Sequence, residues 1–482
     1  MEEEKPEQGH HIKIKRFQFI MIVFALVFVT AAVTTITLAF GDEKAVEVGA
    51  PARAEFNKLY EAYDKIESGY YKEVDQDTLV NGAINGMIDA LEDPYSDYMN
   101  KEEASQFHEG VSSSFEGIGA EIQEQDGFIM IVSPIKGSPA EKAGLKPNDM
   151  VMSVDGKSIQ GMSASEAVLL IRGEKGTKVK LEVKRNGLDK TQEMIIVRDK
   201  IPIETVYVEV DENKIAHIQI TSFSEHTAEE LNTALADMEK KEVKGIVLDL
   251  RQNPGGLLDQ AIKMANYFVP EGKNIVQIES NDGKVQAYKA EGGNKVDLPT
   301  AVLIDSGSAS ASEILAAALH ESAAIPLIGE KSFGKGTVQS AEDFSDESNL
   351  KLTTAKWLTP NGTWIHEKGI EPDTAVNLPD YASLSYINPE SELKLEVLSD
   401  EVKTAEQMLT ALGYDPGKVD GYFDESTKNA VEEFQKASDI ESNGILTGAA
   451  TTKLMEELRL KLQENDTQLN KAIESVKAKV KQ

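Results

Sequence analysis

The chain has 482 residues, of which 40% are hydrophobic, so it has room for about three domains with ordinary apolar cores. Its 82 acidic and 50 basic residues give a net charge of -32, which argues against nucleic acid or an anionic membrane surface as a partner of the main body. The chain has no cysteine, which excludes disulfide bonds and thiolate metal sites.

An uncharged apolar run at residues 17–40 is long enough to cross a bilayer as a helix. Three basic residues precede it: Lys13, Lys15 and Arg16. Because positive charge stays on the cytoplasmic side, we expect residues 1–16 to be a cytoplasmic tail and the rest of the chain to be exported. The alternative is a cleaved signal peptide with small residues near Gly41, but the run is longer than a typical signal core, which favours a retained anchor.

Residues 51–110 have a helical pattern. Apolar residues recur every three or four positions on a first face of Phe56, Leu59, Tyr60, Tyr63 and Ile66, and on a second face of Leu79, Ile84, Met87 and Leu91. The turn-forming stretch 93–96 (DPYS) interrupts this pattern. No residue type here suggests catalysis, so we interpret the segment as a helical module.

Residues 112–199 alternate as strands with one helix, and Gly117, Ile118 and Gly119 precede a strand. Together with the segment 138–145 (SPAEKAGL) and a strand and turn at 149–156, this order resembles a PDZ domain. The resemblance implies that a peptide with a free carboxyl terminus binds as an added strand. Its carboxylate would then be held by the backbone N–H groups of Gly117, Ile118 and Gly119.

Residues 200–390 alternate between strands and helices, which predicts an α/β core domain. His217 is flanked by apolar residues, as expected for a strand residue satisfied near the core. His320 lies ten residues beyond Ser310 on the same expected helix, about 15 Å along its axis, so it cannot be the base for Ser310. No histidine pair has zinc-ligand spacing and no phosphate-binding loop is present, so we expect no metal and no cofactor.

Ser310 lies in the segment 307–313 (GSASASE), between an expected buried strand at 301–304 and an expected helix. A hydroxyl there lies at the positive end of the helix, beside unsatisfied N–H groups that can stabilise the oxyanion formed when a carbonyl is attacked. Ser310 and Glu313 also fit a Ser-x-x-Glu capping box, in which they only satisfy the first helical amides. Taken alone, the segment permits both interpretations.

Lys335 lies between two glycines in the segment 329–339 (GEKSFGKGTVQ). A lysine base needs a pKa lowered from about 10.4 to roughly 7 or 8, and burial without a carboxylate partner has that effect. If the following residues are extended, Gln339 shares a face with Lys335, and its neutral amide orients the amine without raising the pKa. The alternative is a solvated loop lysine.

Three segments in order, 249–256 (DLRQNPGG), 307–313 and 329–339, resemble the signature blocks of the carboxy-terminal processing peptidases, also called tail-specific proteases. The resemblance implies a serine endopeptidase. Its residue roles would be Ser310 as nucleophile, Lys335 as general base, Gln339 as the residue that orients the base, and Ala311, Gly255 and Gly256 as oxyanion-hole amides.

Ser332 departs from the threonine usual at its position in that family, and the resemblance gives it no role. Ser332 and Lys335 also form a Ser-x-x-Lys, the acylation motif of penicillin-binding proteins and related hydrolases. That motif requires a helix, which the glycines on both sides of Lys335 disfavour. We therefore expect Ser310 to be the nucleophile.

The resemblance also concerns regions outside the peptidase core. The helical module dimerises in the resembling family, which implies a homodimer. Arg172 follows the PDZ helix, and its position in the family implies a regulatory role, in which it communicates peptide occupancy to Ser310. An exposed, solvated arginine is the simpler interpretation. Gating of the activity by the PDZ domain is a hypothesis that follows from this order of domains.

Residues 398–456 resemble the peptidoglycan-binding type of three-helix module, with the segments 420–423 (DGYF) and 444–447 (GILT). Attachment to cell wall and a role in packing or dimerisation are equally supported, because few aromatic residues are available to stack on sugars: Tyr414, Tyr422 and Phe423. Residues 457–482 have the composition of a charged helical tail.

We therefore expect a multidomain α/β protein with α+β parts: a transmembrane helix, a helical module, a PDZ domain, a serine peptidase core and a small three-helix domain. The predicted function is that of a single-pass cell-membrane endopeptidase that acts outside the cytoplasm on proteins or peptides with free carboxyl termini, through an acyl-enzyme. The alternatives are a non-catalytic PDZ and wall-binding scaffold and, with less support, a wall-modifying acylase.

Overall fold

The computed structural model describes residues 53–125, 127–185, 190–293 and 295–480. The predicted cytoplasmic tail of residues 1–16 and the predicted anchor of residues 17–40 lie outside these ranges. None of the helices within them is both long and apolar enough to cross a bilayer. The chain divides into two compact units, with the boundary between Met87 and Ile88, inside the predicted helical module.

The described part of the first unit is helical. It contains the short 3-10 helix η1 (Ala54–Phe56), α2 (Asn57–Gly69) and most of α3 (Gln76–Asp89). Large apolar side chains are exposed along these helices and in the segment between α2 and α3: Leu59, Tyr60, Ile66, Tyr70, Tyr71, Val80 and Met87. Within their own unit, these helices therefore leave an apolar surface unburied.

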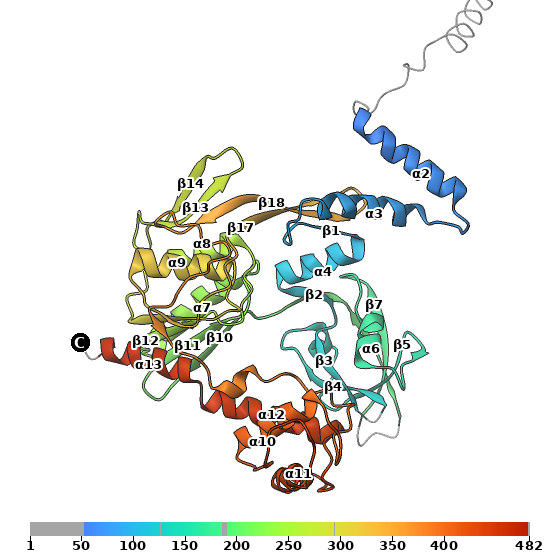
Figure 1. The fold of residues 1–482 in the computed structure, drawn as a ribbon. Helices are drawn as coiled ribbons and strands as arrows, with labels where there is room; N and C mark the ends of the chain where they lie inside the picture. The colour runs from blue at the N-terminus through green and yellow to red at the C-terminus, as the bar shows by residue number, and fades with distance from the viewer. Residues whose placement is uncertain (1–52, 126, 186–189, 294, 481–482) are drawn as a thin grey trace, which may run out of the picture. The chain divides into compact units, whose positions relative to one another are not determined.

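The second unit is built around a six-stranded sheet in the order β10-β11-β12-β15-β16-β19. Figure 1 labels its first three strands, β10, β11 and β12. The first strand is antiparallel to its neighbour and the other five are parallel. The strands are β10 (Val206–Val210), β11 (Ile215–Ile220), β12 (Gly245–Asp249), β15 (Thr300–Ile304), β16 (Leu327–Gly329) and β19 (Thr374–Ala375). Strands β12 and β15 are buried at every position, as parallel strands covered on both faces are.

Helices cover both faces of this sheet. One face packs against α7 (Thr227–Lys240), α8 (Leu258–Asn266) and α9 (Ala311–Ala323). The opposite face packs against α13 (Thr467–Val480), which contacts β11, β12, β15 and β16. The segment expected to be a charged tail is therefore divided, because its first part ends the helix α12 (Gly448–Glu464) and its last part completes the core domain.

A second sheet of five strands has the order β1-β18-β13-β14, with β17 paired to β18. Its strands are β1 (Asp97–Met99), β13 (Asn274–Ser280), β14 (Val285–Lys289), β17 (Thr337–Asp343) and β18 (Asn349–Leu358). The predicted helical module thus contributes one strand to this sheet, followed by the helix α4 (Lys101–Ser112).

The segment that resembles a PDZ domain has a sheet and an apolar cluster of its own. Its sheet consists of β3 (Ala120–Gln125), β4 (Phe128–Pro134), β5 (Met150–Val154), β6 (Lys157–Ser158), β7 (Lys178–Lys184) and β8 (Gln192–Val197). Its helices are α5 (Pro139–Lys142) and α6 (Ala164–Ile171), and a ribbon of β2 (Ser114–Gly117) and β9 (Asp199–Pro202) joins its two ends.

The C-terminal module has η2 (Asp380–Ser383), α10 (Asp400–Leu412), α11 (Glu425–Ala437) and α12 around a separate apolar cluster. Phe423 is fully buried in it, and Tyr414 packs edge-on against Phe434. Of the three aromatic residues considered for sugar stacking, Tyr422 is the exposed one. The other two stabilise the fold.

Candidate active site

Ser310 lies at the turn between β15 and α9 with a φ of 54° and a ψ of -113°. Residues that carry a Cβ rarely adopt this conformation, which costs about 1–3 kcal/mol and persists only where the surroundings hold it. Here the loop after β12 lies against the turn, because a Cβ at Gly255 would come within 2.9 Å of the Ser310 Cβ and 2.7 Å of the Ala309 oxygen. The two loops therefore hold Ser310 at the positive end of α9.

One buried carboxylate joins this turn to the loop of Lys335. Oε1 of Glu313 accepts hydrogen bonds from Ser332 Oγ (2.5 Å) and Gly334 N (2.8 Å). Its Oε2 accepts from Ser310 N and Lys335 N, both at 2.9 Å. Burial raises the pKa of the Glu313 carboxyl, and the four hydrogen bonds oppose that effect. A single side chain thus fixes the backbones of the predicted nucleophile and the predicted base.

The sequence motifs do not indicate this connection between the two loops. For the Glu313 carboxylate, the capping-box motif predicts only the hydrogen bond from Ser310 N. A carboxylate on a buried, apolar helix requires more than one hydrogen-bond donor, however. The apolar sequence around Glu313 therefore indicates that further donors contact it. Ser332, which had no assigned role, is one of these donors.

Lys335 is half-buried, and its Nζ lies 4.7 Å from the centre of the Tyr95 ring. Burial and then the positive charge of Lys351 lower the pKa of Lys335, while the charges of Asp93 and Glu313 act in the opposite direction. No ion pair to Lys335 exists in the described part of the chain. This environment is the one that a lysine base requires.

The predicted oxyanion amides differ in availability. Gly255 N donates to Asn253 Oδ1 at 2.9 Å, so its N–H is already engaged. The N–H groups of Gly256 and Ala311 have no hydrogen-bond partner among the described residues, and both residues line the cavity that contains Ser310. The geometry therefore favours Ala311 and Gly256 over Gly255.

Ser310, Lys335 and Gln339 line one cavity of about 550 Å³. Among the described residues, no hydrogen bond joins Lys335 to Ser310 or to Gln339. Gln339 Nε2 instead donates to Thr337 Oγ1 (3.0 Å) and Thr353 Oγ1 (3.1 Å). The extended strand β17 does place Gln339 on the wall of this cavity, but its amide N–H group is directed at threonine hydroxyls.

The expected carboxylate cradle of Gly117, Ile118 and Gly119 consists of the last residue of β2 and the two residues before β3. Carbonyl groups of Ile118 and Gly119 accept hydrogen bonds from Ala140 N and Ile135 N, whereas their N–H groups have no partner within the described ranges. Gly119 has a φ of +73°, and a Cβ there would lie 2.5 Å from the Ser138 Cβ. The backbone at this point therefore requires glycine and leaves two donors free.

Arg172 lies beside this cradle. Its Nη1 donates to Glu109 Oε2 at 2.9 Å, and its guanidinium lies 4.8 Å from the centre of the Phe115 ring. Glu109 belongs to α4, and Phe107 and Val111 of the same helix line the Ser310 cavity. Arg172 is thus exposed but paired, and it contacts an element that reaches the site.

His217 on β11 contacts Asp249 Oδ2 through Nε2 at 2.9 Å, and His320 packs near Asp373. Neither histidine lines the Ser310 cavity. Within the described ranges, no group of three or more histidine, aspartate and glutamate residues is arranged to hold a metal ion.

Four segments match family models: residues 214–376 peptidase family S41, 117–196 a PDZ domain, 30–103 the N-terminal domain of the activating protease CtpB, and 399–455 a peptidoglycan binding domain. The chain is 52% identical over 459 residues to the carboxy-terminal processing protease CtpA of Bacillus subtilis (strain 168), across 94% of this chain and 98% of that protein. This chain belongs to the carboxy-terminal processing proteases. The family predicted from the three signature blocks is therefore confirmed.

A second relative agrees with this assignment. The carboxy-terminal processing protease CtpB of the same Bacillus strain is 44% identical over 425 residues, across 87% of this chain and 88% of that protein. The solved photosystem II D1 C-terminal processing protease is 29% identical and covers 68% of this chain and 88% of its own, with a TM-score of 0.40. Proteins of this family are serine peptidases, so the chain is a serine peptidase with a PDZ domain and a peptidoglycan-binding-like domain.

Proposed function

We propose that this protease cleaves peptide bonds with Ser310 as the nucleophile and Lys335 as the general base. One observation supports this most strongly: Ser310, the half-buried Lys335 with its lowered pKa, Ala311 and Gly256 all line a single cavity. The N–H groups of Ala311 and Gly256 have no hydrogen-bond partner among the described residues. These are the groups that acyl transfer to a serine requires.

In the proposed reaction, the neutral amine of Lys335 takes the proton of Ser310 as Oγ attacks the peptide carbonyl. The N–H groups of Ala311 and Gly256 stabilise the oxyanion. The C–N bond then breaks, Lys335 returns the proton to the leaving amine, and an ester to Ser310 remains. Lys335 next deprotonates a water molecule that attacks this ester, which releases the acid and restores the serine.

The reaction requires two side chains to move from the positions described. The amine of Lys335 must leave the Tyr95 ring and reach Ser310, and the amide of Gln339 must turn from the threonines toward Lys335. We propose that occupancy of the PDZ domain favours this change. Arg172 supports the proposal, since it contacts both the ribbon beside the cradle, at Phe115, and the helix α4 at Glu109.

Peptide activation tests the role of Arg172. A peptide with a free apolar carboxyl terminus is expected to stimulate cleavage by the wild-type protein and to have little effect on Arg172→Ala. Lys175→Ala serves as a control, because Lys175 is exposed and pairs with Asp199 rather than with α4. Equal stimulation of Arg172→Ala and wild type would show that Arg172 does not communicate peptide occupancy to the Ser310 site.

The substrate proposed is a protein or peptide with a free carboxyl terminus, held in the PDZ cradle. Several side chains in the wall of the Ser310 cavity are apolar: Val111, Leu258, Ile314, Val338 and Trp357. An apolar cavity wall favours an apolar side chain next to the cleaved bond. We therefore propose cleavage near apolar residues of chains that expose their carboxyl termini.

The cellular setting is also a proposal. The uncharged run at residues 17–40 supports a single membrane anchor with the peptidase outside the cytoplasm. The exposed apolar residues of α2 and α3 support a homodimer formed through these helices. For the C-terminal module, the exposed Tyr422 supports contact with the cell wall.

The central experiment measures cleavage of an unfolded protein by the purified full-length chain. Ser310→Ala and Lys335→Ala are each expected to lower the rate by about a thousandfold or more. Matched controls from the same loops are Ser306→Ala, an exposed serine, and Lys331→Ala, an exposed lysine paired with Glu371. Both controls should cleave at the wild-type rate.

A serine-reactive fluorophosphonate identifies the nucleophile directly. It is expected to label wild type at Ser310 and to leave Ser310→Ala unlabelled. The rate of wild type should rise with pH as Lys335 loses its proton, at a pH below that of an ordinary lysine. If wild type neither cleaves nor becomes labelled, with and without the activating peptide, the scaffold interpretation replaces this proposal.

A further inference from the structure

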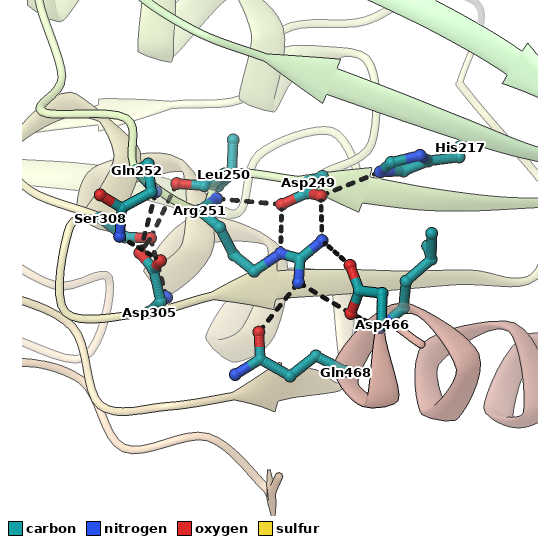
Figure 2. Close-up of polar contacts among 10 residues, drawn as sticks. His217, Asp249, Leu250, Arg251, Gln252, Asp305, Ser308, Asp466 and Gln468 are labelled. Atoms are coloured by element: carbon teal, nitrogen blue, oxygen red, sulfur yellow. Dashed lines mark hydrogen bonds and ion pairs between the residues drawn. The ribbon is translucent and has the colours of Figure 1, made fainter. Parts of the chain in front are cut away.

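Arg251 lies in the loop after β12 that leads to Gly256, and only 13% of its side chain is exposed. All five N–H donors of its guanidinium are engaged (Figure 2). Nε and Nη2 donate to Asp249 at 2.9 and 2.7 Å, Nη1 and Nη2 donate to Asp466 at 3.0 and 2.8 Å, and Nη1 also donates to Gln468 Oε1 at 2.9 Å. This arrangement saturates the guanidinium and fixes its plane.

Asp249 is the partner of Arg251 whose carboxylate stays charged. Burial by itself raises the pKa of its carboxyl, but hydrogen bonds from His217 and Arg251 outweigh burial and lower the pKa to about 2. Asp249 therefore stays ionised at neutral pH and holds Arg251 even without other partners. The contacts to Asp466 and Gln468 are additional to that pair, and they come from a distant part of the chain.

Asp466 and Gln468 lie at the start of α13, beyond the peptidoglycan-binding-like module. Asp466 Oδ1 also accepts from Leu469 N at 2.8 Å, which ties it to the helix end. Gln468 is fully buried, and its Nε2 donates to Glu330 Oε1 (3.0 Å) and to Val376 O (2.9 Å). Glu330 begins the loop that carries Lys335. One side chain of α13 therefore contacts both the loop after β12 and the loop after β16.

Hydrogen bonds of the loop after β12 connect Arg251 to the turn of Ser310 and to the Gly256 amide. Gln252 has a φ of 54° and donates from N (2.9 Å) and Nε2 (2.6 Å) to Asp305, the residue that starts the turn of Ser310. Asn253 then donates to Ile220 O at 2.7 Å and accepts from Gly255 N. A shift of Arg251 would consequently disturb the Ser310 turn and the adjacent amide of Gly256.

We propose that Asp466 and Gln468 are positioning residues of the peptidase. They hold Arg251 and Glu330, and through them the loops that carry the Gly256 amide and the Lys335 amine. The peptidase core is thus discontinuous in sequence, since a helix beyond the C-terminal module completes it. This inference rests on the proposed function of Ser310 and adds two residues that do not touch the substrate.

The test uses Asp466→Asn and Gln468→Ala in the purified full-length protein, with Val476→Ala as the matched control. Val476 is buried on the same helix but contacts Gly245, at the opposite end of β12 from Arg251. Both positioning variants are expected to lower kcat about 10- to 100-fold, because small displacements of catalytic groups have large effects on rate. Their KM should stay within about twofold of wild type. Val476→Ala should lower the Tm and leave kcat unchanged.

The affinity for a peptide boronate distinguishes a positioning role from a purely structural one, which would leave this affinity unchanged. The boronate forms a tetrahedral adduct with the serine and uses the oxyanion amides, whereas a cleaved product peptide does not. The boronate affinity is expected to fall in parallel with kcat in Asp466→Asn, while product affinity stays unchanged. Asp466→Glu, which keeps the carboxylate, should recover part of both losses. If Gln468→Ala does not fold, Asp466→Asn decides alone, since Arg251 keeps its pair with Asp249.

Two outcomes are distinguishable. If Ser310→Ala cleaves like wild type, the proposed function fails and this inference fails with it. If Ser310→Ala is inactive while Asp466→Asn keeps the wild-type kcat and boronate affinity, only the positioning role is overturned, and α13 is then a packing helix.

Discussion

Two fully buried glutamates, Glu313 and Glu406, lie in different domains and have similar environments but different roles. Glu313 on α9 accepts hydrogen bonds from Ser310 N and Lys335 N, whereas Glu406 on α10 accepts from Gly421 N (2.9 Å) and Thr427 Oγ1 (3.1 Å). Burial raises the pKa of both carboxyls. Neither burial nor the pKa distinguishes them. What differs is that Glu313 holds two loops of the active site and Glu406 holds a loop of the C-terminal module.

Their partners also differ in kind. Glu313 faces three backbone N–H groups, which can only donate, and the hydroxyl of Ser332, which already accepts from Ile370 N at 2.7 Å. Thr427, the partner of Glu406, has a hydroxyl that can turn and accept a hydrogen bond instead. Glutamine can therefore replace glutamate at 406 with its bonds intact, but at 313 its NH2 group must face donors.

The largest effect is expected from Glu313→Gln. Whichever way the amide is placed, its NH2 group faces donors that cannot turn, and each unsatisfied buried donor costs about 1–3 kcal/mol. The loops of Ser310 and Lys335 should separate, and kcat should fall at least about 100-fold. Single-turnover cleavage, measured well below the Tm of the variant, checks this. A variant with near wild-type kcat would show that Glu313 is only a helix cap.

A smaller effect is expected at Ser332. Ser332→Ala removes one donor to Glu313 and leaves Ile370 N without its acceptor, so the rate should fall by about tenfold. Ser332→Thr keeps the hydroxyl and should cleave like wild type. Equal rates for alanine and threonine at this position would contradict the role given to the Glu313 network.

Lys351→Gln tests how a nearby positive charge affects Lys335. The positive charge of Lys351 helps to lower the pKa of Lys335, so its removal should move the acid limb of the pH–rate profile to higher pH. Cleavage should drop severalfold at neutral pH and match wild type at the alkaline plateau. Lys356→Gln is the control, since Lys356 is exposed and lies over Trp364. A uniform loss at every pH would indicate damage to packing instead.

Glu406→Gln should have the smallest effect. Cleavage is expected to stay at the wild-type rate, and the free energy of unfolding should change by at most about 1 kcal/mol. Because the folded-state pKa of Glu406 is raised, its ionised form is disfavoured in the fold. Wild type should thus lose stability relative to the variant as pH rises above about 4.3, the unfolded value. Unfolding of both proteins at pH 4 and pH 7 measures this difference.

Local pattern was enough to predict much of this fold. The expected strand at 301–304 falls within β15, and Ser310 lies at the expected strand-to-helix turn. Such features depend on apolar periodicity and on turn residues that lie within a few positions of one another in the sequence. The signature blocks likewise sufficed for the family, because their residues are contiguous in sequence.

Contacts between distant residues were not predictable in the same way. Arg251 and Asp466 are 215 positions apart, and nothing in the charged composition of residues 457–482 indicates that part of it is buried. The engagement of the Gly255 amide by Asn253 depends on the exact path of a loop. These residues become neighbours only in the folded sheet, where the ends of its strands lie together, so a local sequence pattern does not indicate their contacts.

The position of α13 has a consequence for biosynthesis. This helix follows every other described element, yet it covers apolar residues made much earlier: Ile215, Val247, Ala301, Leu303 and Ile328. During synthesis, that face of the sheet has no cover until residues 467–480 leave the ribosome. A nascent chain therefore has its serine and lysine long before it has the helix that closes the core. We therefore expect cleavage activity to appear only after α13 has packed against the sheet.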